Sequence, residues 1–234
     1  MIQSLLRQLP LGFSHQEEAS FDNYYVGKNA EIVDYLKRVI DNQLRENSYL
    51  CSVQGLGRSH LLHAVCRYAD MQGVSSVYIP MRQVEQATPD VLLELETISL
   101  VCLDDIEVIA GKSAWEEALF YLYNRVQATG NRLIVTANGL PKEINIGLPD
   151  LVSRLTWGML YQLQSLQDDE KVSMLMMRAK RRGMMLPSDV AQYILTHCPR
   201  HMSTLVTALD VLDKASLAAQ RRLTVPFVKH VLQI

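Results

Sequence analysis

Short apolar segments that alternate with longer helical patterns constrain the fold of this chain more than any other sequence feature. Between the apolar segments, apolar residues recur at the three- and four-residue spacing of amphipathic helices. Because strands that alternate with helices are joined by right-handed crossovers, the pattern predicts a parallel five-stranded sheet in an α/β core. The predicted strands cover residues 49–53, 76–79, 100–103, 132–136 and 159–163, and the predicted helices cover 29–44, 60–71, 91–96, 115–129 and 150–155.

The strand pattern stops near residue 165, and only helical patterns follow. The first of these, residues 169–182, begins with acidic residues, ends with basic ones and is followed by Gly183, which is typical of a complete helix. Further helices are predicted at 187–197, 203–220 and 226–232. We therefore expect an arm over residues 1–20, an α/β core over 21–164 and a small all-helical lid over 165–234.

Composition and charge exclude several classes of protein. No apolar run reaches the roughly 18 residues of a membrane span, and the N-terminus lacks the pattern of a signal peptide, so we expect a cytoplasmic protein without a membrane partner. The formal net charge of −2 does not favour direct binding of nucleic acid. The 4 cysteines form no C-x-x-C pair, and we expect reduced, buried thiols.

A glycine-rich turn between the first strand and the next helix is the strongest local signal. Glycines let backbone N–H groups approach a phosphate, and the N-terminus of the following helix attracts negative charge. The segment departs twice from the usual phosphate loop, since Ser52 replaces the first glycine and Arg58 replaces the lysine. A plain glycine turn is the alternative to a phosphate loop in which Ser59 binds magnesium. The residues concerned are Gly55, Leu56, Gly57, Arg58 and Ser59.

Polar side chains also follow the third and fourth predicted strands. Asp104 and Asp105 end an apolar strand, and Asn138 follows the next one. Near a phosphate loop, Asp104 can hold magnesium directly or through water and Asp105 can orient an attacking water, whereas two solvated acids are the alternative. Asn138 is placed to act as a γ-phosphate sensor or to form an ordinary turn. Together with the loop, these residues predict a nucleotide site.

Motifs along nearly the whole chain resemble the AAA+ core of the bacterial replication initiator DnaA. They are FDNY at 21–24, GLGRSHLLHAV at 55–65, LDDI at 103–106, AGK at 110–112, PKEI at 141–144, SRL at 153–155 and WG at 157–158. The chain is similar to DnaA-related regulators, which keep this core and its lid and lack the initiator's C-terminal DNA-binding domain. The resemblance implies an AAA+ P-loop fold with bound ADP or ATP. It places His60 in the nucleotide-binding segment, although the sequence favours packing over metal binding for His60 and His63.

The resemblance also assigns roles to two arginines. Arg154 matches the arginine-finger position, from which a cation inserted into a partner's site stabilises charge on the transferred phosphoryl group. A surface ion pair with Asp150, one helical turn earlier, is the alternative for this side chain. Arg200 is the candidate for the lid's sensor arginine, because Ser203 occupies the usual place of that residue.

A segment near the N-terminus resembles the peptide that docks on the bacterial sliding clamp, with apolar anchors that enter a preformed pocket. Its apolar anchors are Leu9, Leu11 and Phe13, and Gln8 makes polar contacts. The resembling family acts on DNA through the β subunit clamp of DNA polymerase III, is active with ADP bound, and promotes hydrolysis of DnaA-bound ATP. The resemblance thus implies DnaA and the clamp as partners, DNA reached through the clamp, and head-to-tail homo-oligomers as a possible assembly.

Three other functions stay open. A partner-independent ATPase, such as a helicase loader, is allowed by Asp104, Asp105 and Asn138 and disfavoured by Arg58 and Ser203. A DNA-binding relative of the initiator is disfavoured by the neutral charge. A scaffold that links the clamp to DnaA differs from the regulator only in needing no Arg154.

Overall fold

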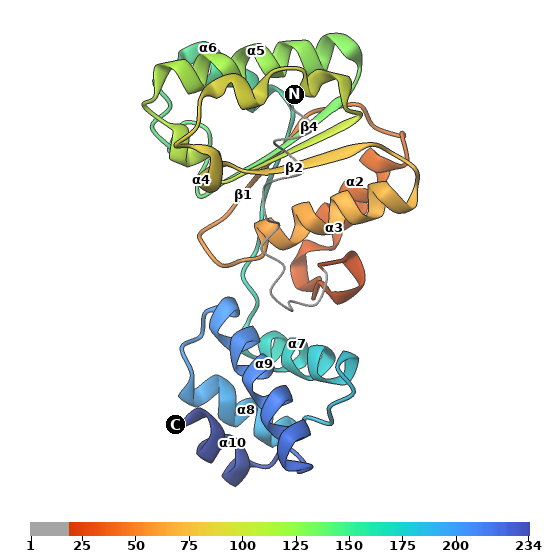
Figure 1. Cartoon of the computed structure of the whole chain (residues 1–234), viewed down its shortest axis with the longest axis vertical. Helices are drawn as coiled ribbons and strands as arrows, with labels where there is room; N and C mark the ends of the chain where they lie inside the picture. Colours follow the sequence, from red (N-terminus) through yellow and green to blue (C-terminus); the bar gives the residue numbers. More distant parts are fainter. Residues whose placement is uncertain (1–18) are drawn as a thin grey trace. The chain divides into compact units, whose positions relative to one another are not determined.

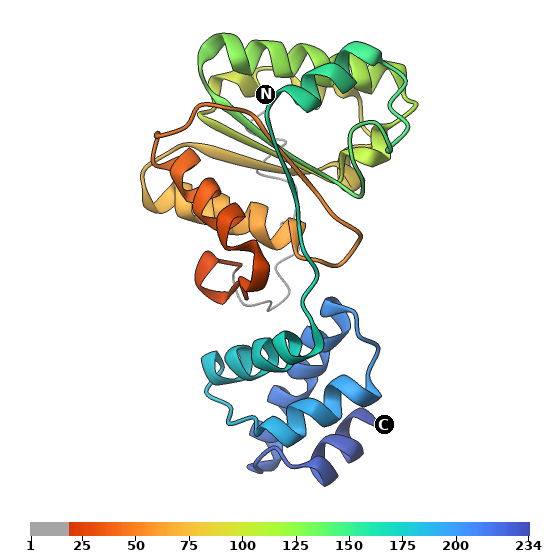
Figure 2. The same cartoon turned by 180° about the vertical axis from the view of Figure 1, so that it is seen from behind.

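The computed structural model describes residues 19–234 (Figures 1 and 2). Two compact units contain these residues. The first comprises residues 19–24, 29–54 and 58–163, and the second comprises 25–28, 55–57 and 164–234. The clamp-like peptide at 8–13 lies outside the described residues. Within 19–234, the helices are too short or too polar to cross a membrane.

A parallel sheet forms the centre of the first unit, and its strand order is β2-β3-β4-β1-β5. The register places Cys51 beside Ala137 and Leu103 beside Val135, so three strands end at one edge. The predicted five-stranded sheet is confirmed. Its strands are β1 (Ser48–Cys51), β2 (Ser76–Pro80), β3 (Leu100–Asp104), β4 (Arg132–Ala137) and β5 (Met159–Gln162).

Helices cover both faces of this sheet (Figures 1 and 2). One face carries α2 (Ala30–Ile40) and α3 (Arg58–Met71), and the other carries α5 (Ser113–Thr129) and α6 (Pro149–Trp157). Apolar side chains of α5 and α6, among them Leu119 and Leu155, pack against the sheet in one continuous core. The short helix α4 (Met81–Val84) follows β2 directly.

Two predicted helices are shorter or more broken than the sequence pattern indicates. Residues 91–96 do not form one α-helix, because Glu94 has a left-handed φ of 62° that separates η3 (Pro89–Leu92) from η4 (Leu95–Thr97). α2 ends at Ile40 rather than at residue 44, and Asn42 has a φ of 62°. Further 3-10 helices are η1 (Phe21–Asn23), η2 (Gly27–Asn29) and η5 (Ile106–Ile109).

The second unit contains the four helices predicted for the lid. Leu175, Ile194, Leu209 and Val228 are buried together at its centre. Gly183, with a φ of 75°, follows the end of the first helix as predicted. The helices are α7 (Asp168–Arg181), α8 (Ser188–His197), α9 (Met202–Ala219) and α10 (Val225–Leu232).

Candidate nucleotide-binding site

The loop between β1 and α3 has the backbone that its glycines allow. Gly55 and Gly57 have φ values of 86° and 96°, a region that other residues rarely adopt. A Cβ atom added at Gly55 would meet no atom within 4 Å. Glycine is therefore favoured there by the positive φ of the backbone and not by lack of space. Ser52, which stands at the expected first glycine, is buried, and its N–H donates to the Ala137 carbonyl at 3.2 Å.

Arg58 turns into the edge of the sheet. Its Nη1 donates to the carbonyls of Ser52 and Ala137, each at 2.5 Å, and its Nη2 donates to Asp105 Oδ1 at 2.6 Å. The residue is only 6% exposed. A planar guanidinium can serve these three acceptors at once, which a single ammonium group cannot do with the same geometry. Arg58 therefore fastens the ends of β1, β3 and β4 to one another.

Asp105 is held between two arginines. Its Oδ2 accepts from Arg82 Nε at 2.7 Å, opposite the Arg58 bond to Oδ1. Glu107 accepts from Arg82 at 3.0 Å and lies 3.7 Å from Arg58, and burial raises the pKa of its carboxyl. The carboxylate predicted to orient water therefore already has a cation on each oxygen.

Asp104 is bonded on both oxygens by hydroxyl groups. Thr136 donates to Oδ1, and Tyr78 donates to Oδ2 at 2.7 Å. Burial, followed by the charge of Asp104, raises the pKa of Tyr78. Asp104 is 3% exposed. This arrangement of Asp104 does not fit a directly bound magnesium ion.

The two histidines of α3 make packing and hydrogen-bond contacts. His60 Nε2 lies 3.1 Å from the Ser20 carbonyl oxygen, and its ring contacts Tyr24. The His63 ring lies 4.0 Å from that of Tyr78. Within residues 19–234, no group of three His, Cys, Asp or Glu is arranged to hold a metal ion. The four cysteines, all in this part of the chain, are free thiols; Cys51 and Cys102 are buried, whereas Cys66 and Cys198 are only partly buried.

The sensor candidates lie in different parts of the chain. Asn138 follows β4 with an exposed side chain, and its N–H donates to Glu107 Oε2 at 3.3 Å. Arg200 lies in the second unit, where it pairs with Asp168 at 2.9 Å. Its side chain is 64% exposed, so the pair is a surface one.

Arg154 does not form the ion pair with Asp150 that the helical spacing permits. Its guanidinium carbon instead lies 4.7 Å from the centre of the Trp157 ring. Arg154 forms no salt bridge with any of the described residues. The Trp157 side chain on which it lies is 68% exposed. The arginine-finger candidate thus presents an unneutralised cation stacked on an aromatic ring.

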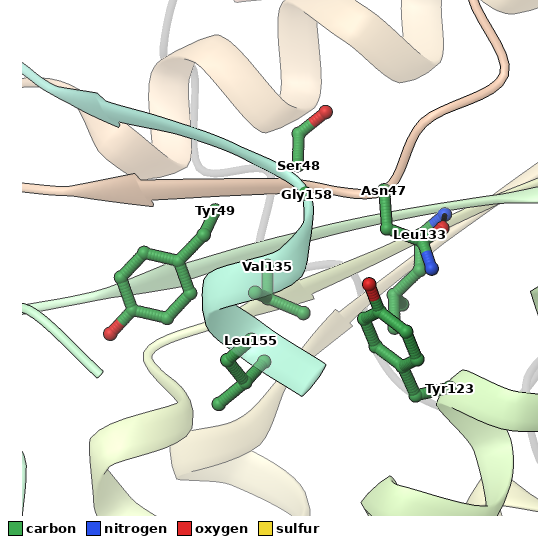
Figure 3. Close-up of a pocket in the computed structure, with 8 residues that line it drawn as sticks. All are labelled: Asn47, Ser48, Tyr49, Tyr123, Leu133, Val135, Leu155 and Gly158. Carbon is green, nitrogen blue, oxygen red and sulfur yellow. Dashed lines mark hydrogen bonds between the residues drawn. The ribbon is translucent and has the colours of Figure 1, made fainter. Parts of the chain in front are cut away.

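Both ends of α6 are fixed to the core. At the start, buried Glu116 accepts N–H groups of Gly111, Gly147 and Leu148 at 2.6, 3.0 and 2.8 Å. At the end, Gly158 packs against Asn47 beside a cavity of about 10 Å³ (Figure 3). That cavity has room for at most one water molecule.

Comparison with known families identifies this core. The model of the bacterial DnaA ATPase domain matches residues 15–162, well over half of the chain. The chain belongs to this DnaA ATPase-domain family. The model described as the Hda lid domain matches residues 168–232. The DnaA-type core is therefore followed by a lid of the Hda type.

Solved structures share the AAA+ fold of this DnaA-family chain. Domain III of DnaA from Thermotoga maritima has a TM-score of 0.81 at 18% identity, covering 93% of this chain and 97% of that one. AMPPCP-bound DnaA from Aquifex aeolicus has a TM-score of 0.74 at 20% identity, covering 86% of this chain and 66% of that longer one. A RuvB mutant from Thermotoga maritima has a TM-score of 0.71 at 14% identity, covering 92% and 71%.

Two residues of the site escape a search by motif. Arg82 follows β2, and Tyr78 lies within it. The two motifs of the site lie elsewhere: the glycine-rich loop follows β1, and the acidic pair stands at the end of β3. The available signal is topological: β2 pairs with β3 so that Pro80 stands beside Asp104. Polar side chains near the end of the neighbouring strand are thereby brought to the acidic pair.

Proposed function

We propose that this chain is a regulator that holds ADP in its own site and stimulates hydrolysis of the ATP carried by DnaA. The observation that carries the proposal is the pairing of Asp105 with Arg58 and Arg82, at 2.6 and 2.7 Å. A carboxylate held in two ion pairs is a poor acceptor for the proton of an attacking water. The chain's own site is therefore better suited to holding a nucleotide than to hydrolysing it.

Arg154 is the residue that would act on the partner's nucleotide. Its charge has no acidic partner among the described residues, and its helix is anchored by Glu116 and Asn47. A positioned cation of this kind costs little reorganisation when it meets developing negative charge. Arginine fingers supplied to a partner's site are worth roughly 10³ to 10⁵ in rate.

Tethering to the β sliding clamp rests on the N-terminal peptide. Gln8, Leu9, Leu11 and Phe13 supply the polar and apolar anchors of this proposal. Docking through such a peptide raises the effective concentration of the chain near clamp-loaded DNA without any direct contact with DNA. The formal net charge of −2 agrees with this indirect route to DNA.

The test is ATP hydrolysis by DnaA on clamp-loaded DNA in the presence of the wild-type chain or a variant. The informative variants are Arg154→Ala and a chain lacking residues 1–13. Arg181→Ala is the matched control, because Arg181 is an exposed arginine of α7. We expect strong stimulation by the wild-type chain and the control, and DnaA's basal rate with the other two.

Each alternative function gives a different result. Stimulation that survives Arg154→Ala would leave only a scaffold that joins the clamp to DnaA. Robust ATP hydrolysis by the chain alone would support a partner-independent ATPase or helicase loader. Tight, strongly salt-dependent DNA binding without the clamp would support a DNA-binding relative of the initiator.

A further inference from the structure

Tyr78 contacts Asp104, one of the two residues predicted to bind magnesium. Its hydroxyl donates to Asp104 Oδ2 at 2.7 Å. Its ring packs against His63, with ring centres 4.0 Å apart, which restricts where the hydroxyl can lie. The Tyr78 hydroxyl thus occupies one oxygen of this carboxylate.

The other oxygen of Asp104 is also engaged. It accepts the Thr136 hydroxyl, whose oxygen in turn accepts the N–H of Asp105 at 3.0 Å. Asp105 has a φ of 58°, so this link supports a backbone conformation that few residues adopt. Magnesium dehydrates reluctantly and demands near-ideal octahedral oxygen ligands. Entry of the ion would require this network to break.

Two guanidinium groups already supply the positive charge that a metal would bring. Arg58 and Arg82 both bind Asp105, and Arg82 also binds Glu107 at 3.0 Å. Arg58 is buried, whereas the Arg82 side chain is 52% exposed. The acidic edge of the sheet is thus largely neutralised by the chain itself.

We infer that this chain binds a nucleoside diphosphate without magnesium, and that the Tyr78 hydroxyl excludes the ion by occupying Asp104 Oδ2. The inference rests on the nucleotide binding proposed above and concerns its metal requirement. In the absence of a metal, the phosphates would depend on backbone N–H groups in the first turn of α3.

The experiment measures the affinity of the full chain for ADP by calorimetry, in buffers that contain either magnesium or EDTA at equal ionic strength. The wild-type chain should bind ADP equally well in both. Tyr78→Phe keeps the ring and removes only the hydroxyl, which frees Asp104 Oδ2. Its affinity should become roughly tenfold greater with magnesium than with EDTA, as expected when a hydrogen bond to a carboxylate no longer competes with the ion.

Tyr68→Phe is the matched control, because the Tyr68 hydroxyl donates to Asp41 at a surface outside the site. It should behave as the wild type does. ADP binding by the wild-type chain only in magnesium would overturn the inference while leaving the proposed function intact. Equal affinities in the two buffers for Tyr78→Phe would overturn the role of its hydroxyl. Failure of the wild-type chain to bind ADP in either buffer would instead contradict the proposed function.

Discussion

Replacing Gly158 with alanine should strain the junction between α6 and β5. An added Cβ would lie 2.0 Å from the Asn47 carbonyl oxygen and 2.8 Å from its carbon. The φ and ψ values of Gly158, −86° and −168°, suit alanine, so the cost comes from the clash and not from the backbone conformation. The contact must open from 2.0 Å to at least 3.0 Å before it resembles any real Cβ contact.

The magnitude follows from what Asn47 holds together. Its carbonyl accepts the Met159 N–H at 3.0 Å, and its Oδ1 accepts the Leu133 N–H at 2.9 Å. A shift of this backbone weakens the hydrogen bond to Met159, which contributes about 1 kcal/mol. Overpacking by the added methyl group costs about 1–3 kcal/mol more. The neighbouring cavity of about 10 Å³ is too small to relieve the clash. We expect Gly158→Ala to lower the free energy of unfolding of the first unit by about 2–4 kcal/mol.

Guanidinium denaturation followed by tryptophan fluorescence measures this change, because Trp115 and Trp157 both belong to the first unit. Gly139→Ala is the matched control: its Cβ would meet the flexible Glu143 carboxylate at 3.3 Å, and we expect a change of no more than about 0.5 kcal/mol. Stimulation of DnaA should also fall in Gly158→Ala, because Arg154 lies one turn earlier. Unfolding free energies of Gly158→Ala and Gly139→Ala that agree within about 0.5 kcal/mol would refute the reasoning.

Two other groups give predictions of their own. Glu116→Gln replaces a carboxylate that accepts three N–H groups with an amide that has one acceptor oxygen. The free energy of unfolding, measured with denaturant, should fall by about 2–3 kcal/mol. An unchanged unfolding midpoint would contradict this prediction. Burial lowers the pKa of His63 below 6.5, so the unfolded chain binds a proton that the folded chain resists as the pH falls. The free energy of unfolding should therefore decline below about pH 6.5. His63→Phe, which keeps an aromatic ring against Tyr78, should weaken that decline. Equal pH profiles of urea unfolding for the wild-type chain and His63→Phe would count against this prediction.

Much of the fold follows from local sequence pattern. The alternation of apolar segments located all five strands, and the acidic start, basic end and following glycine located α7. The helix predicted over residues 91–96 was wrong, because Glu94 adopts a left-handed conformation that its residue type does not predict. Such a residue is set by the surrounding packing, which a periodic pattern does not describe.

The site was only partly predictable, since its residues meet through the sheet. The loop and the acidic strand are visible as motifs, but the direction of Arg58 depends on acceptors from β1, β3 and β4 together. Tyr78 and Arg82 become part of the site only because β2 is the neighbour of β3. Strand order is a long-range property, and the motifs alone did not supply it.

The placement of Arg154 separates the proposed arginine finger from the acidic residues of the chain's own site. Its helix is fixed at the start by Glu116 and at the end by the contact of Gly158 with Asn47, and neither anchor touches the carboxylates that Arg58 neutralises. A cation held by rigid packing needs no turnover in its own subunit to be presented to a partner. Under the proposed function, loss of hydrolysis in the chain's own site would carry no penalty, whereas loss of either anchor of α6 would.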